Sequence, residues 1–85
     1  MVEDDYNHAA RSSVRANTIS GPVARGVVMR NDSANAGIRP HFDVADNIID
    51  GASRPGAAER GKTAAPLSLV WRGNRTGQGR TLPPP

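Results

Sequence analysis

Alternation of apolar and polar residues is clearest in residues 17–30, where it predicts extended chain. The large apolar residues of this segment share one face of a strand by a period of two: Ile19, Val23, Val27 and Met29. Such a period is typical of a half-buried strand. Two glycines and Pro22 interrupt the pattern, so we expect a short β-prone segment. The stretch from Leu67 to Trp71 is the other strand candidate.

Helical spacing predicts two short helices on either side of this segment. In residues 1–16, Asp4 and Asp5 would lie at the favourable N-terminal end of a helix. In residues 40–51, Asp43 can cap the first amides and Gly51 can end the helix. The apolar faces are short: Tyr6, Ala9, Ala10 and Val14 in the first, and Val44, Ala45, Ile48 and Ile49 in the second.

The composition favours disorder for most of the chain. Leu, Ile, Val and Phe make up 15 of 85 residues, below the roughly 20% under which disorder is the usual expectation. Nine Gly and seven Pro add breaks, and no internal repeat of solenoid length is evident. We therefore expect a mostly disordered chain with no stable globular domain, in which residues 52–85 form a flexible basic tail.

Charge and cysteine content narrow the function classes. The chain has no cysteine, which excludes a disulfide framework, a zinc ribbon and a thiol nucleophile. No apolar run approaches a membrane span, and the acidic N-terminus differs from a signal peptide, so we expect a cytoplasmic protein without a membrane partner. Residues 1–50 carry a net charge of −2, and residues 51–85 carry +5. Such a small apolar core favours a protein that is not an enzyme and uses no cofactor.

The segment Asn17-Thr-Ile-Ser-Gly21-Pro-Val23-Ala-Arg-Gly26-Val27-Val28 resembles the RHIM-like amyloid-signalling motifs of actinobacterial immune and cell-death proteins. The matching positions are Asn17, Ile19, Gly21, Val23, Val27 and Val28, while Gly26 lies one place later than in that family and Met29 replaces a glutamine. The resemblance implies in-register cross-β stacking that recruits a partner protein or a second copy. The alternative interpretation is an ordinary short hairpin or a fortuitous Gly/Val segment.

A second motif, Gly56-Ala-Ala-Glu-Arg-Gly61-Lys62-Thr63, resembles the phosphate-binding loop of P-loop nucleotidases. The resemblance implies loop amides around the phosphates, Lys62 on the outer ones and Thr63 on magnesium. The surrounding sequence lacks the preceding buried strand and a following helix, since Pro66 comes soon after. A chance match in a Gly-rich linker is the alternative interpretation.

The third candidate is the basic tail with its single Trp71, together with Arg72, Arg75 and Arg80. Arginine beside glycine with an aromatic ring is typical of sequence-tolerant nucleic-acid binding. The alternative is a solvated tail that reflects an arginine-rich composition. The two histidines, His8 and His41, lack the spacing of a metal or catalytic site, so we expect no metal and no catalytic residues.

We therefore expect a small, non-enzymatic interaction or adaptor protein that signals through a β-stacking motif at residues 17–30. The alternatives are weak nucleic-acid binding through the Arg/Gly tail, nucleotide binding through residues 56–63, and a fragment or spurious reading frame without a selected function.

Overall fold

The computed structural model describes residues 2–5, 11–32, 37 and 39–85. The elements of this described part are all strands: β1 Val2–Asp5, β2 Arg11–Arg15, β3 Thr18–Ile19, β4 Val23–Asn31, β5 His41–Ala45, β6 Ile48–Ile49, β7 Ala52–Arg60 and β8 Ser68–Arg72. Because the described residues form no helix, none of them belongs to a helix that could cross a membrane.

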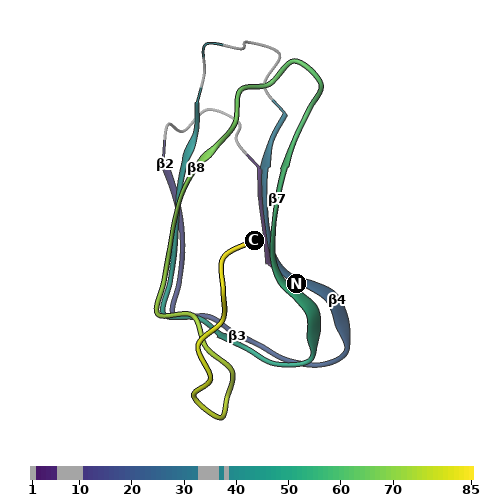
Figure 1. The fold of residues 1–85 in the computed structure, drawn as a ribbon, viewed down its shortest axis with the longest axis vertical. Helices are drawn as coiled ribbons and strands as arrows, with labels where there is room; N and C mark the ends of the chain where they lie inside the picture. Colours follow the sequence, from purple (N-terminus) through teal and green to yellow (C-terminus); the bar gives the residue numbers. More distant parts are fainter. Residues whose placement is uncertain (1, 6–10, 33–36, 38) are drawn as a thin grey trace.

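The strands stack in three parallel sheets, ordered β1-β4-β7, β2-β5-β8 and β3-β6. The first two turns of the chain each contribute one strand to all three sheets in the same order, and the third turn contributes β7 and β8 to two of them; this arrangement is a parallel β-solenoid. We call residues 2–21 the first coil, 22–51 the second coil and 52–76 the third coil. The coils overlie one another when the molecule is viewed down its shortest axis (Figure 1). The molecule measures 40 × 20 × 18 Å.

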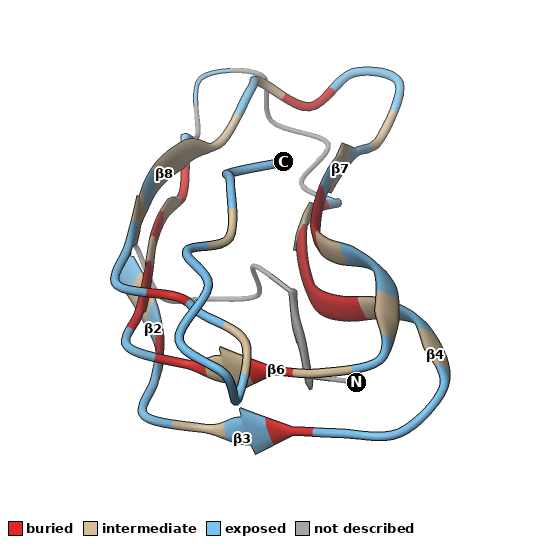
Figure 2. Ribbon diagram, turned by 60° about the horizontal axis from the view of Figure 1, so that its bottom comes forward, coloured by how far each residue is buried: buried red, intermediate tan, exposed pale blue. Residues whose placement is uncertain are grey.

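Buried residues occur in strands of all three sheets (Figure 2). In the sheet β2-β5-β8, Val14, Val44 and Trp71 stand in register, one in each coil. Phe42 and Val44 of the central strand are fully buried. The buried cluster consists of Val14, Ile19, Val27, Met29, Phe42, Val44 and Ile49, with Ala52, Leu67, Leu69, Trp71 and Leu82 packed against it.

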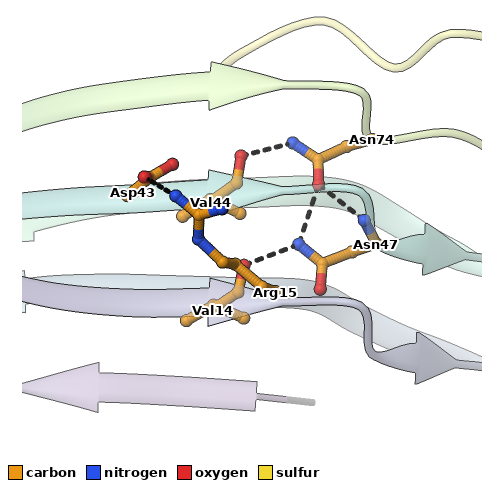
Figure 3. A network of polar contacts seen from close by, with 6 residues as sticks. All are labelled: Val14, Arg15, Asp43, Val44, Asn47 and Asn74. Atoms are coloured by element: carbon orange, nitrogen blue, oxygen red, sulfur yellow. Dashed lines mark hydrogen bonds and ion pairs between the residues drawn. The ribbon is translucent and has the colours of Figure 1, made fainter.

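One corner of every coil is held by an asparagine. Asn17, Asn47 and Asn74 lie one above another, and each follows a residue with positive φ: Ala16, Asp46 and Gly73. The Nδ2 of Asn47 donates to Asn74 Oδ1 at 2.8 Å and to Val14 O at 3.0 Å (Figure 3). Asn74 Nδ2 donates to Val44 O at 2.9 Å. These bonds satisfy backbone groups that the sharp corner removes from the sheets.

The expectation that the chain lacks a solenoid repeat is wrong. Asn17-Thr-Ile-Ser-Gly21 recurs as Asn47-Ile-Ile-Asp-Gly51, one coil later. The asparagines of successive coils are 30 and then 27 residues apart. Because the spacing changes and the outward residues differ, the repeat is hard to find in the sequence. Both glycines have positive φ, and a Cβ on Gly51 would lie 2.4 Å from Gly21 O.

The expected helices are absent from the described residues. In residues 40–51 the chain forms β5 and β6, with a corner between them. Asp46 has a φ of 60°, which a right-handed helix excludes. The apolar residues assigned to one helical face instead divide between two strands. In residues 1–16, β1 and β2 replace the helix, and Tyr6, His8, Ala9 and Ala10 lie outside the described residues.

The expectation of a mostly disordered chain with a flexible tail at residues 52–85 is also wrong. Strands β7 and β8 build the third coil on the second, with Val27 opposite Gly56 and Val44 opposite Trp71. Pro55 is tolerated because β7 is an edge strand, where a missing amide hydrogen costs no pairing. The narrow core and the inter-coil hydrogen bonds need less apolar volume than the composition suggested.

Candidate functional site

The most distinctive surface is a set of exposed cations on the third coil and the residues that follow it. We call it the basic rim: Arg54, Arg60, Lys62, Arg72, Arg75 and Arg80. All six residues are exposed. Two of them lie on β7, one follows that strand, one ends β8, and the last two lie beyond it. Because β7 and β8 are edge strands of their sheets, the third coil is an outer layer of the solenoid, and residues 51–85 carry a net charge of +5.

The only acidic residue of the third coil does not neutralise this rim. Glu59 lies on β7 in register with Arg30 of the second coil. Its carboxylate pairs with the guanidinium of Arg25, and its Oε1 lies 4.0 Å from Arg30 Nη2. Across residues 2–5, 11–32, 37 and 39–85, no ion pair joins a rim cation to an acidic group. Within the described residues, the six rim cations are therefore exposed and take part in no ion pair, although the carboxylates of Asp46 and Asp50 lie beside Gly73 and Gly77.

The outer face of β2-β5-β8 is more nearly balanced. Arg15 of the first coil pairs with Asp43 of the second, and Asp43 Oδ1 is buried without a hydrogen-bond partner. His41 Nδ1 lies 3.1 Å from Ser68 Oγ, one strand away. No group of three His, Cys, Asp or Glu side chains that could hold a metal ion occurs in the described part of the chain. The polar groups on this face therefore occur in pairs and do not form a set of metal ligands.

The residues predicted for nucleic-acid binding are only partly brought together. Arg72, Arg75 and Arg80 all belong to the basic rim. Trp71 instead turns inward, and its Nε1 donates to Leu82 O at 2.9 Å. Sequence reasoning missed Arg54 and Arg60, although the net charge of residues 51–85 indicated them. They join the rim because β7 belongs to the same coil as β8.

The residues of the P-loop-like segment are not arranged as a phosphate cradle. Residues 56–60 lie in β7 and pair with β4, and the amide of Gly61 donates to Asn31 O at 2.9 Å. Lys62 and Thr63 are exposed in the turn that follows, and β8 comes next instead of a helix. A hollow of about 220 Å³ opens nearby, and its lining residues are Ala58, Glu59, Arg60, Pro66 and Leu67.

The residues of the RHIM-like segment serve the solenoid itself. Asn17 stands in the asparagine stack, and Gly21 turns the chain into β4. The remaining residues are at least partly buried: Ile19, Gly26, Val27 and Val28 fully, and Val23 to an intermediate extent. Strand β4 pairs with β1 on one side and β7 on the other. In the folded chain the apolar side chains of this segment are therefore at least partly buried, and residues 27–30 of β4 are paired on both sides, whereas β3 pairs with β6 alone.

Comparison of the chain with family models, with curated proteins and with solved structures gives no match.

Proposed function

We propose that the chain is a non-enzymatic binding module that holds nucleic acid by its phosphates through the basic rim. The observation that carries this proposal is the set of six exposed cations on the third coil and the strand-free residues after it, none of which forms an ion pair within the described part of the chain. Phosphate contacts supply most of the sequence-independent affinity of nucleic-acid binding proteins. A nucleic-acid partner also agrees with a cytoplasmic protein.

The surface supports a nucleic-acid partner better than a protein partner. Protein interfaces depend on a few large apolar or aromatic anchors at their centre. Among the described residues, Val70 is the exposed large hydrophobic side chain, at 38% exposure. Trp71 is half-buried and hydrogen-bonded, so base stacking contributes little. We therefore expect binding through charge, without sequence preference.

An adaptor that recruits partners through residues 17–30 receives less support from this geometry. Val27 and Val28 are fully buried, and β4 is hydrogen-bonded on both edges. Stacking through these residues would require the second coil to leave the solenoid. For the folded chain we therefore assign the interaction surface to the basic rim.

The test is salt-dependent binding of a labelled 20-base-pair DNA duplex, followed by fluorescence anisotropy. Six phosphate contacts predict a slope of log affinity against log salt of about −5, and each lost contact lowers its magnitude by about 0.9. Arg60→Gln and Arg72→Gln should each remove about one contact. Arg15→Gln removes the same charge from a paired arginine of the first coil and should leave the slope nearly unchanged.

Poly-glutamate of similar length distinguishes nucleic acid from an acidic protein as the partner. Competition by poly-glutamate as strong as that by unlabelled duplex would assign the rim to acidic polypeptides. An equal loss of slope in the Arg15 variant, or no binding at 50 mM salt, would contradict a phosphate-binding rim.

A further inference from the structure

The last residues of the described chain fold back across the open end of the third coil. We call residues 77–85 the strap. In Figure 1 the strap is the yellow segment that runs between β8 and β7. A tight turn begins it, in which the amide of Thr76 donates to Arg80 O at 2.8 Å and the amide of Arg80 donates to Thr76 Oγ1 at 3.1 Å. An antiparallel bridge between Arg75 and Thr81 then starts its return.

The strap is held at its start by Gly77, whose amide donates to the carboxylate of Asp50 at 2.9 and 3.0 Å, and farther along by Leu82. The amide of Leu82 donates to Asn74 O at 2.9 Å, and its carbonyl accepts the indole hydrogen of Trp71 at 2.9 Å. Its side chain packs against the buried core. The carbonyl that Trp71 bonds belongs to the peptide bond preceding Pro83. Both the backbone and the side chain of Leu82 therefore contact the third coil and the core.

Gly56 makes room for the Trp71 ring and for the end of the strap. A Cβ at this position would lie 2.6 Å from Trp71 Cζ3, 2.7 Å from Cη2 and 3.4 Å from Pro85 Cδ. The indole therefore lies against the bare backbone of β7, with Pro85 close by. In other folds, aromatic-lined grooves recognise proline-rich segments. The carbonyls of such segments make no internal hydrogen bonds, so they are available to a donor such as the indole N–H.

We propose that Trp71, Gly56 and Asn74 form a binding site for a proline-rich peptide with leucine before its first proline. The strap is the ligand of this site within the chain, and a partner segment of the same chemistry competes for it. Leu82-Pro83-Pro84-Pro85 supplies the chemical identity of that partner, because this segment occupies the site in the structure.

The strap is suited to exchange. Residues 77–81 and 83–85 are exposed, and Leu82 is the residue of the strap that is partly buried. Segments with few buried contacts open at a lower free energy than the whole fold. When the strap occupies the site most of the time, the apparent affinity for a competing peptide is the intrinsic affinity multiplied by the fraction of time that the site is empty.

The test uses the full-length chain with Leu82→Gly and a synthetic peptide of residues 78–85. Trp71 is the single tryptophan, so its emission reports the site directly. The peptide should shift this emission to the blue and bind the Leu82→Gly chain about tenfold more tightly than the wild-type chain, because the strap no longer competes. A peptide of the same composition in scrambled order should not bind.

Trp71→Phe in the Leu82→Gly background keeps the ring and removes the donor. Calorimetry should then give binding several-fold weaker, and binding should not depend on salt, unlike that of duplex DNA to the basic rim. A Leu82→Gly chain that is folded by circular dichroism but does not bind the peptide at millimolar concentration would overturn the site. If that variant does not fold, the indole N–H resonance of wild-type Trp71 decides: a shift with millimolar peptide supports the site, and no shift overturns it.

Discussion

Asn47 and Asn74 are buried at the same corner of adjacent coils, and Asn47 Nδ2 donates to Asn74 Oδ1 at 2.8 Å. The same nitrogen donates to Val14 O in the first coil, and Asn47 Oδ1 accepts the backbone amide of Asn17 at 3.0 Å. The side chain of Asn47 therefore connects all three coils. A stack of this kind fixes which residues of successive coils lie opposite one another.

Asn47→Ala should be among the most destabilising substitutions in the chain. It removes the partners of Val14 O and of the Asn17 amide, and each buried polar group left without a partner costs about 1–3 kcal/mol. We expect a loss of about 3 kcal/mol in the free energy of unfolding, measured by urea denaturation. Asn17→Ala, at the partly exposed end of the stack, should cost about 1 kcal/mol. Equal losses in the two variants would contradict the role of the central asparagine.

Ala16→Gly should stabilise the chain. Ala16 is exposed and has a φ of 55°, a conformation that costs an L-residue about 1–2 kcal/mol and glycine little. After the extra entropy of an unfolded glycine is subtracted, we expect a gain of up to about 1 kcal/mol, or about 4–8 °C in the thermal midpoint.

Ala24→Gly is the matched control, because Ala24 is also exposed but lies within β4. It should lower stability by about 0.5–1 kcal/mol. A decrease in stability for both variants would argue against the left-handed corner at Ala16.

Gly51→Ala and Gly79→Ala separate backbone strain from close packing. Both glycines have positive φ, 80° and 89°. A Cβ on Gly51 would lie 2.4 Å from Gly21 O, whereas a Cβ on Gly79 would meet no atom within 4 Å. We expect Gly79→Ala to cost about 1 kcal/mol and Gly51→Ala at least about 3 kcal/mol. Chemical denaturation of the two variants measures the difference, and similar values would mean that the first and second coils are not packed this closely.

Val27→Ala tests whether residues 17–30 serve the core. Val27 is fully buried, and its truncation should cost about 2 kcal/mol through lost burial and a residual cavity. Thr18→Ala, at an exposed position of the same segment, should change stability by less than about 0.5 kcal/mol. If residues 17–30 were instead an exposed recruitment motif, Val27→Ala would leave the thermal midpoint unchanged.

Local patterns predicted some elements and misassigned others. The alternation in residues 17–30 predicted β3 and β4, and the run from Leu67 to Trp71 predicted β8. The spacing of Val44, Ala45, Ile48 and Ile49 fits a helix as well as two strands joined by a corner. The positive φ of Asp46 decides for two strands and a corner. Residues other than glycine adopt a positive φ only rarely, so the sequence does not indicate this corner. The expectation of disorder for residues 52–85 was wrong because β7 and β8 pair with strands β4 and β5 of the second coil.

The sequence likewise predicted some residues of the candidate sites and misassigned others. The charge of residues 51–85 indicated a basic surface, and Arg72, Arg75 and Arg80 belong to it. Arg54 joins them only because the third coil brings β7 and β8 into one layer. The sequence predicted that Trp71 stacks on a nucleic-acid base. Its partner turned out to be the carbonyl of Leu82, 11 residues later, rather than an incoming base.

The amino-acid sequence by itself determined the excess of positive charge after Gly51, the absence of cysteine and the β-prone character of residues 17–30. The tertiary structure decided the stacking of the coils, the inward turn of Trp71 and the burial of Val27. Parallel pairing joins residues that are 27 or 30 positions apart at the asparagine corner, so its hydrogen bonds leave no local periodicity in the sequence. Such contacts form only when distant segments meet, which a pattern read along the chain does not contain.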